Sequence, residues 1–290
     1  MLMMYLRRPT YILTLVLFLG MIAVIITACS FKSVYNRMDY LIPSYVEGMV
    51  SLDDVLEEKV QQRAQLLVNW HRNTQLKQYA QLLRTFQQDA GPQLNEERVL
   101  QHMATMESFW QSLLLRIDEE MAGLLPLLDA DQQQELFASI TSKNDAFREE
   151  YVDIDEEERI EVYSENINDI CETWLGDTTQ IQQREINKSA AKLQSSALLR
   201  LQQRLSWQNS IRKILQSSDK TEVKSQRLLE FFQKNYGHNA ELKAVTESNK
   251  RVIAQLIVQI FHSLSADQRR HFIDKTDEYI RIFTELAEGR

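Results

Sequence analysis

Glycine and proline are scarce in this chain, with seven Gly and four Pro among 290 residues. Alternating apolar and polar runs, which are typical of half-buried strands, are absent, and Gln, Glu, Leu, Arg and Ala dominate. These absences argue against strands and predict an all-α protein. We expect an elongated bundle of about eight or nine helices, several of them long, in one domain over residues 29–290.

Cysteine is nearly absent as well, since the chain has only Cys29 and Cys171. If processing removes or modifies the first, a single thiol remains, which excludes an intrachain disulfide framework. Cys171 lies near Ile167, Ile170 and Trp174 in a helical pattern. We therefore expect Cys171 to be a buried, unreactive thiol.

Positive charge is in the minority, with 33 Lys and Arg against 41 Asp and Glu. Removing residues 1–28 takes away Arg7, Arg8 and no acid, which leaves 31 basic residues against 41 acidic ones. Nucleic-acid binding and peripheral binding to anionic lipid both need clustered Lys or Arg. The composition argues against both, and solubility is the simplest explanation of the negative charge.

Long hydrophobic runs are absent except for one, from Tyr11 to Ile26, which follows Arg7 and Arg8. Its length suits the apolar region of a signal peptide and is short for a bilayer span. An uncleaved anchor helix is the alternative. The run ends in Ile26-Thr27-Ala28-Cys29-Ser30, which resembles the lipobox of bacterial lipoproteins.

The lipobox resemblance implies that residues 1–28 are a cleaved signal peptide and that Cys29 carries covalent fatty chains such as palmitate. Several acyl chains make such an anchor effectively permanent. Ser30, where Asp would favour retention in the inner membrane, suggests sorting to the outer membrane. We expect a lipid-anchored protein facing the periplasm, with no other cofactor.

Capping and breaking residues divide the mature chain into predicted helices. Pro43 is expected to end the first helix, and Ser51 to cap the second. A helix over 178–216, which contains neither Gly nor Pro, would be about 58 Å long. The predicted helices are 33–42, 52–90, 95–125, 129–151, 155–175, 178–216, 221–236, 239–264 and 266–287.

The last two predicted helices show clear packing patterns. In the last helix, apolar residues and one Thr recur at alternating steps of four and three, which is one continuous buried stripe. The apolar face of the helix over 239–264 is too broad for a surface helix, so this helix should lie between neighbours. The stripe of the last helix consists of Phe272, Thr276, Tyr279, Phe283 and Leu286.

The predicted helix over 52–90 has two apolar faces that point in different directions. Its first half presents Val60, Ala64 and Leu67, whereas the second half has a rotated face made of Leu76, Tyr79, Leu83 and Phe86. The change of face falls within residues 69–75, which predicts a kink or break there. Trp70, His71 and Arg72 lie at that irregularity.

Residues 34–86 resemble an uncharacterised family of proteobacterial envelope lipoproteins. The resemblance rests on Tyr35-Asn36-Arg37-Met38-Asp39 for a Tyr-Asn-x-Leu-Asp pattern, and on Trp70-His71-Arg72 before Tyr79. Gln75 and Lys77 depart from the acid and the Pro of that pattern. The family implies an all-helical envelope lipoprotein, with 33–90 as its signature part, and no known activity. The candidate cluster, either a ligand site or a structural network, is Tyr35, Asp39, Trp70, His71, Arg72 and Tyr79.

Two short segments are weakly similar to the Leu-Thr-x-x-Gln signature of Spy-type periplasmic chaperones. They run from Leu128 to Gln132 and from Leu264 to Gln268, and neither contains the Thr. Plain helix capping boxes explain both segments. An internal repeat of 128–151 and 264–287 remains an alternative.

Motifs of catalysis and metal binding are missing. The chain has no Gly-rich phosphate loop, no Gly-x-Ser-x-Gly and no His-Glu-x-x-His. His71 with Asp39 or Glu47 is the one conceivable acid–base pair, and a structural hydrogen bond is the more frequent role for such a histidine. We therefore expect a non-catalytic module that binds or scaffolds another envelope component. A chaperone for unfolded clients is the alternative, and a cell-envelope hydrolase is less favoured.

Overall fold

The structure is a computed structural model that describes residues 28–235 and 239–289. The predicted signal peptide, apart from Ala28, lies outside the described residues. Within them the regular secondary structure is entirely helical, with no strand, which confirms the all-α class. No helix of this part is both long and apolar enough to cross a bilayer.

The described helices are more numerous than the eight or nine predicted. The predicted helices over 52–90 and 178–216 are each divided in two, and the first predicted helix is replaced by the pair α3 and α4. Their bounds are α3 Ala28–Tyr35, α4 Met38–Glu47, α5 Asp54–Thr74, α6 Leu76–Asp89, α7 Glu96–Leu124, η1 Leu125–Leu127, α8 Ala130–Tyr151, α9 Glu156–Leu175, α10 Gln180–Ala190, α11 Ala197–Leu215, α12 Thr221–Asn235, α13 Ala240–His262 and α14 Ala266–Ala287.

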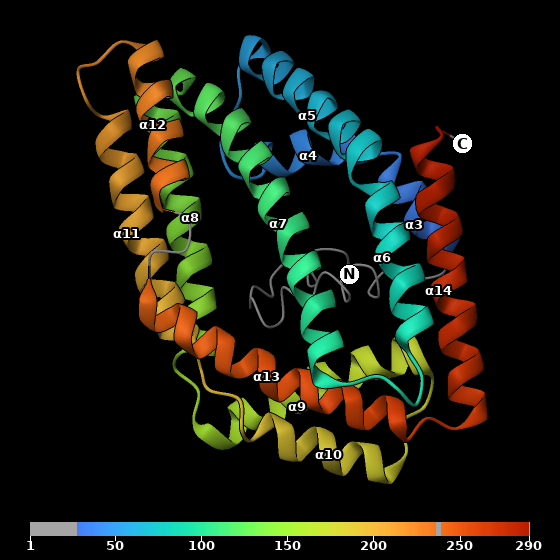
Figure 1. Cartoon of the computed structure of the whole chain (residues 1–290). Coiled ribbons are helices and arrows are strands. Elements are labelled where there is room, and N and C mark those ends of the chain that lie inside the picture. Colours follow the sequence, from blue (N-terminus) through green and yellow to red (C-terminus); the bar gives the residue numbers. More distant parts are fainter. Residues whose placement is uncertain (1–27, 236–238, 290) are drawn as a thin grey trace.

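The helices form an open frame rather than an elongated bundle along one axis (Figure 1). In that view α8, α11 and α12 make one side, and α3, α6 and α14 make the opposite side. Helices α9, α10 and α13 cross the lower end, and α4 and α5 lie at the upper end. Helix α7 runs through the middle and contacts α5, α6, α12 and α13, so it joins the parts of the frame.

The largest hydrophobic core lies where α6, α7, α13 and α14 meet, and it also takes in side chains of α3, α9 and α10. All five residues of the predicted stripe on α14 are buried, which confirms that stripe. Helix α13 packs between α7 and α10, as the breadth of its apolar face predicted.

The predicted helix over 178–216 is wrong, because the chain leaves the helix at residues 191–196, between α10 and α11. Side chains that are distant in the sequence form hydrogen bonds with the backbone of this segment. The buried Asn249 side chain bonds the N–H and the C=O of Gln194, and Arg159 donates to the Leu193 carbonyl at 2.6 Å. The segment therefore satisfies its buried backbone without continuing the helix.

The predictions for Pro43 and Ser51 are also wrong. Pro43 lies inside α4, and the break comes earlier, at Asn36-Arg37, where the Asn36 side chain accepts a hydrogen bond from Arg72 at 3.0 Å. Asp53 rather than Ser51 caps α5, with its carboxylate accepting from the N–H of Leu56 at 2.8 Å. The Ser51 backbone instead bonds the side chains of Glu135 and Gln132 on α8.

The predicted break within 69–75 is confirmed, since α5 ends at Thr74 and α6 starts at Leu76. Gln75 lies between the two helices with φ −98° and ψ −43°, so the chain kinks without leaving helical geometry. Helix α5 packs on α4 and α7, whereas α6 packs mainly on α14. The change of face along this segment therefore reflects a change of packing partner.

Candidate functional site

The kink between α5 and α6 brings three polar side chains of the predicted cluster together. His71, in the last turn of α5, lies between two tyrosine hydroxyls. Its Nδ1 is 2.8 Å from the hydroxyl of Tyr35 on α3, and its Nε2 is 3.1 Å from the hydroxyl of Tyr79 on α6. The three residues come from three helices and form one hydrogen-bonded row, the Tyr35–His71–Tyr79 row.

Helix α3 fixes the position of Tyr35 because Phe31 and Lys32 of the same helix contact α14. Phe31 packs against Tyr35, and against Tyr279 and Phe283 of α14, with ring centroids 5.9 to 6.1 Å apart. The Lys32 ammonium donates to the Glu285 carboxylate at 2.8 Å, and this interaction lowers the pKa of Glu285. Packing of the first described helix on the last one therefore fixes one end of the row.

The row is enclosed by rings. Tyr79 packs against Phe109 of α7 and Phe283 of α14, with centroids 5.3 and 5.9 Å away. Tyr35 and Tyr79 are buried, and His71 is mostly buried. Among the described residues, the surroundings of this row are therefore those of a closed core.

Burial keeps all three groups neutral. It lowers the pKa of His71 to about 4, and it raises the pKa of Tyr35 and of Tyr79 above the ordinary value. A neutral imidazole has one N–H donor and one acceptor nitrogen, so one tyrosine hydroxyl donates to the ring and the other accepts from it. The row is satisfied as hydrogen bonds between neutral groups, and a histidine with so low a pKa is a weak base near pH 7.

The other members of the predicted cluster lie around the row. Arg72 donates to Asn36, and its guanidinium carbon is 5.4 Å from the centre of the Tyr35 ring. The Trp70 ring lies beside the His71 ring, with centroids 6.3 Å apart. Asp39, on α4, is partly exposed and makes no hydrogen bond to His71 in the described part of the chain, and neither does Glu47. His71 thus pairs with tyrosines, and the conceivable acid–base pair is not formed.

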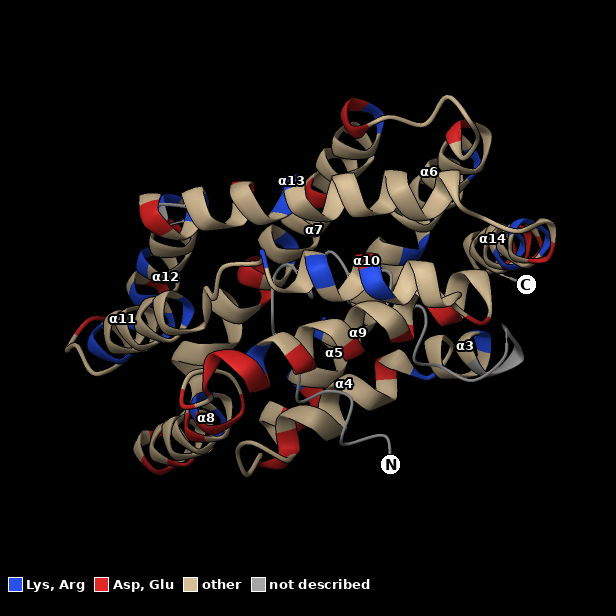
Figure 2. Ribbon diagram, turned by 90° about the horizontal axis from the view of Figure 1, so that it is seen from below, with Lys and Arg blue, Asp and Glu red and all other residues tan. Residues whose placement is uncertain are grey.

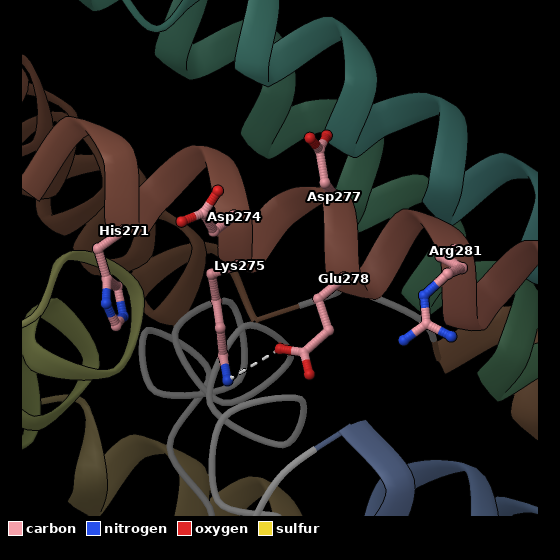
Figure 3. Close-up of a pocket in the computed structure, with 6 residues that line it drawn as sticks. All are labelled: His271, Asp274, Lys275, Asp277, Glu278 and Arg281. Carbon is pink, nitrogen blue, oxygen red and sulfur yellow. Dashed lines mark ion pairs between the residues drawn. The ribbon is translucent and has the colours of Figure 1, made fainter.

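A hollow of about 520 Å³ lies elsewhere, along α14 (Figure 3). The side chains that line it all come from this one helix, and Lys275 and Glu278 form an ion pair at 3.4 Å. The described residues therefore bound the hollow from one side only. The lining residues are His271, Asp274, Lys275, Asp277, Glu278 and Arg281.

The two chaperone-like segments form capping boxes. The Asp129 side chain accepts from the N–H of Gln132, and the Gln132 side chain accepts from the N–H of Asp129. Ser265 and Gln268 make the same pair of bonds at the start of α14. Helix capping is thus the role that the geometry gives these residues.

A third capping box, which the sequence analysis missed, interlocks with the box on α14. Thr179 and Gln182 form it at the start of α10. The Gln182 and Gln268 amides bond each other in both directions, at 3.1 and 2.8 Å, and Gln268 also donates to the Asp177 carbonyl. Both glutamines are buried, so two helix starts share one polar contact in the core.

Cys171 lies against the main core, and the described part of the chain has no disulfide partner for it. Burial raises the pKa of its thiol to about 12, so thiolate is rare near neutral pH. No group of three or more His, Cys, Asp or Glu in the described residues could hold a metal ion.

Basic and acidic residues are concentrated in different segments of the chain, a contrast that the net charge alone does not reveal. Residues 188–235 contain ten Lys or Arg and three Asp or Glu, whereas residues 129–172 contain three basic and fifteen acidic residues. In Figure 2, Lys and Arg appear as blue ribbon segments on α11 and α12, whereas the ribbon around α8 and α9 carries more of the red of Asp and Glu. Counting charge by segment would have found this contrast in the sequence.

Two arginines of the basic region, residues 188–235, contact aromatic rings within the protein. The guanidinium groups of Arg204 and Arg212 lie over the rings of Phe147 and Phe137 on α8, each 4.3 Å from the ring centre. Lys213 and Lys220 are exposed, and neither forms an ion pair with another described residue. These two lysines keep their charge available to a partner.

Comparison with protein families gives one result. The model of a family described as "Family of unknown function (DUF6279)" matches residues 49–239. That range includes the kink and Trp70-His71-Arg72, whereas Tyr35 and Asp39 precede it. The comparison with curated proteins and the comparison with solved structures each find no match. The matched range is more than half of the chain, so this protein belongs to the DUF6279 family, whose function is unknown.

Proposed function

We propose that this protein is a lipoprotein of the outer membrane, anchored through acyl chains on Cys29 and facing the periplasm, which binds or scaffolds another envelope component without catalysing a reaction. The observation that carries the proposal is the lipobox-like segment Ile26 to Ser30, which overlaps the start of the first described helix at Ala28. The residue that would carry the lipid, Cys29, thus lies in α3, next in the chain to the residues that pack on α14.

The enclosure of the Tyr35–His71–Tyr79 row in the core supports a non-catalytic role. This row contains the most distinctive residues of the sequence, and its hydrogen bonds join neutral, buried groups. Such a network stabilises the joint between α3, α5 and α6 and offers no exposed nucleophile or base. A hydrolase built on Trp70-His71-Arg72 is correspondingly disfavoured.

The basic region of α11 and α12 supports a binding role. An acidic protein that gathers exposed lysines on one pair of helices is suited to attract a partner with a complementary acidic surface. We therefore propose that Lys213 and Lys220 contact an acidic surface of another envelope protein. A chaperone for unfolded clients remains the second candidate function, and the paired capping boxes give it no separate support.

Affinity capture of the acylated protein from envelope membranes tests these functions. We expect one stoichiometric protein partner whose capture weakens as salt rises, because exposed charges are screened. A broad mixture of unfolded outer-membrane proteins would instead favour the chaperone. Mass spectrometry of the mature protein checks the anchor, and a free thiol at Cys29, or residues 1–28 still attached, would contradict it.

A charge-reversed pair of variants gives the matched control. Lys213→Glu with Lys220→Glu should abolish capture of the partner, whereas Lys59→Glu with Lys77→Glu should leave it intact. All four lysines are exposed and outside the ion pairs of the described residues, so both double variants change the net charge equally. Equal loss of capture in the two would show that only the total charge matters.

A further inference from the structure

We propose that the exposed face of α4 lies against the membrane surface, with lipid headgroups as its partner. The inference rests on the proposed lipid anchor at Cys29 and extends it, because it assigns an orientation to the folded body. It is argued from the position of the anchor, the short path to α4 and the composition of the exposed face.

The anchor residue belongs to the folded body and is not at the end of a flexible linker. Helix α3 starts at Ala28, so the backbone of Cys29 lies in its first turn. Phe31 and Lys32, in the next turn, hold α3 on α14 through ring packing and the Glu285 ion pair. Acyl chains on Cys29 would therefore bring the bilayer directly to this part of the protein.

The path from the anchor to α4 is short and fixed. Only Asn36 and Arg37 separate α3 from α4, and the Arg72–Asn36 bond holds this turn. Tyr40 follows Cys29 by eleven residues, which corresponds to about 16 Å along a helical path. In Figure 1, α3 lies beside α14 and leads directly into α4 at the upper end of the frame.

One arc of the exposed surface of α4 carries no charged side chain of its own. Pro43 is buried and Val46 packs on a neighbouring core, which defines the inner side of the helix. At about 100° per residue, the opposite arc extends from Tyr40 to Tyr45. Exposed Glu47 lies just outside this arc, whose residues within α4 are Tyr40, Leu41, Ser44 and Tyr45.

The side chains of this arc suit the interface between water and lipid. Tyr40 is 69 % exposed, the largest fraction among the large hydrophobic residues described. Tyrosine has an apolar ring and a polar hydroxyl, and it is enriched where lipid headgroups meet the acyl region. Arg37 lies beside the arc, and the Lys143 ammonium donates to the Tyr45 hydroxyl at 2.7 Å and lies 4.4 Å from the centre of its ring. Exposed Glu47 also borders the arc, so its border carries charges of both signs and contact with the interface should not require anionic lipid.

Site-directed spin labelling of the acylated protein in vesicles tests the orientation. The label is placed at Tyr40→Cys or, on the same arc, at Ser44→Cys. Ile181→Cys on α10 is the matched control, because Ile181 is 66 % exposed and α10 lies at the other end of the frame (Figure 1). Cys171 should react little, since its thiol is buried and rarely ionised.

Vesicles of phosphatidylethanolamine and phosphatidylglycerol, and vesicles of phosphatidylcholine alone, are compared with detergent solution. We expect labels at positions 40 and 44 to lose collisions with a water-soluble nickel chelate severalfold in both kinds of vesicle, with no change at 181. Unchanged collisions at 40 and 44 in a protein shown by mass spectrometry to carry lipid on Cys29 would overturn the orientation alone. A mature protein without lipid would overturn the anchor and the orientation together.

Discussion

The side chain of Asn249 closes two hydrogen bonds with the backbone of Gln194, 55 residues earlier in the chain. The amide oxygen accepts from the N–H at 2.9 Å, and the amide nitrogen donates to the carbonyl at 2.8 Å. Asn249 is fully buried on α13, so this pair of bonds fixes the turn between α10 and α11 against the core.

Replacing Asn249 by Ala should therefore destabilise the protein by about 3 kcal/mol, because two backbone groups lose their partners in a buried place. Equilibrium unfolding in urea measures the change. Gln194→Ala is the matched control, since Gln194 is exposed and its backbone would keep both bonds. We expect that control to stay within about 0.5 kcal/mol of the natural protein, and an equal loss in the two variants would contradict the assignment.

The low pKa of His71 predicts a loss of stability in acid. Burial lowers this pKa to about 4 from an ordinary 6.5, so between these values the unfolded chain binds a proton that the folded chain does not. The contribution of His71 is complete above pH 6.5 and falls by about 3 kcal/mol as the pH drops to 4.

Urea unfolding at several pH values measures this loss, and His71→Gln provides the comparison. Glutamine retains one donor and one acceptor for the two tyrosines but does not titrate. The free energy of unfolding of the variant should decline less between pH 6.5 and 4. If natural protein and variant decline in parallel, protonation of His71 is not the cause.

The two buried glutamines that join the starts of α10 and α14 should behave as a coupled pair. Gln182→Ala and Gln268→Ala each leave the other amide without its partner, at about 2 kcal/mol apiece. The double variant should lose about 1 kcal/mol less than the sum of the single losses. Gln132→Ala, in a capping box whose glutamine faces no second glutamine and donates only to the exposed Ser51 carbonyl, should lose only about 1 kcal/mol, and strict additivity of the pair would refute the coupling.

Phe31 should be essential for holding α3 on α14. Its ring packs on Tyr35, Tyr279 and Phe283, so Phe31→Ala should lower the free energy of unfolding by about 2 to 3 kcal/mol. Ser33→Ala, at an exposed position of the same helix, should change stability little. Amide hydrogen exchange at residues 30–36 gives a local readout, and unchanged protection in Phe31→Ala would argue that other contacts hold α3.

The fold features that could be predicted from sequence are those set by nearby residues. The predicted helices starting at 95 and 129 match α7 and α8, which Asn95 and Asp129 cap, because a cap bonds an N–H three residues away. The buried stripe of α14 follows from spacing along one helix. The break at 191–196 could not be predicted in this way, since it depends on Asn249 and Arg159, which are distant in sequence.

In the candidate site, too, the features set by nearby residues could be predicted and those set by distant residues could not. The change of apolar face near His71 was enough to predict the kink, which is a local property of the α5–α6 segment. The partners of His71 were not predictable, because Tyr35 reaches it only when α3 is held by α14, the last helix of the chain. Asp39, which the sequence analysis considered as an acidic partner of His71, lies on α4 and makes no hydrogen bond to the His71 ring among the described residues.

The packing of α3 on α14 has a consequence for the order of synthesis and folding. Residues from Tyr35 to Leu286 share the largest core, so that core cannot be completed until the final helix has left the ribosome. Contacts between the two ends of a chain form late and slow the folding of a domain. A late-closing core of this kind suits the proposed export of the protein, because an export channel for unfolded polypeptides requires an open chain.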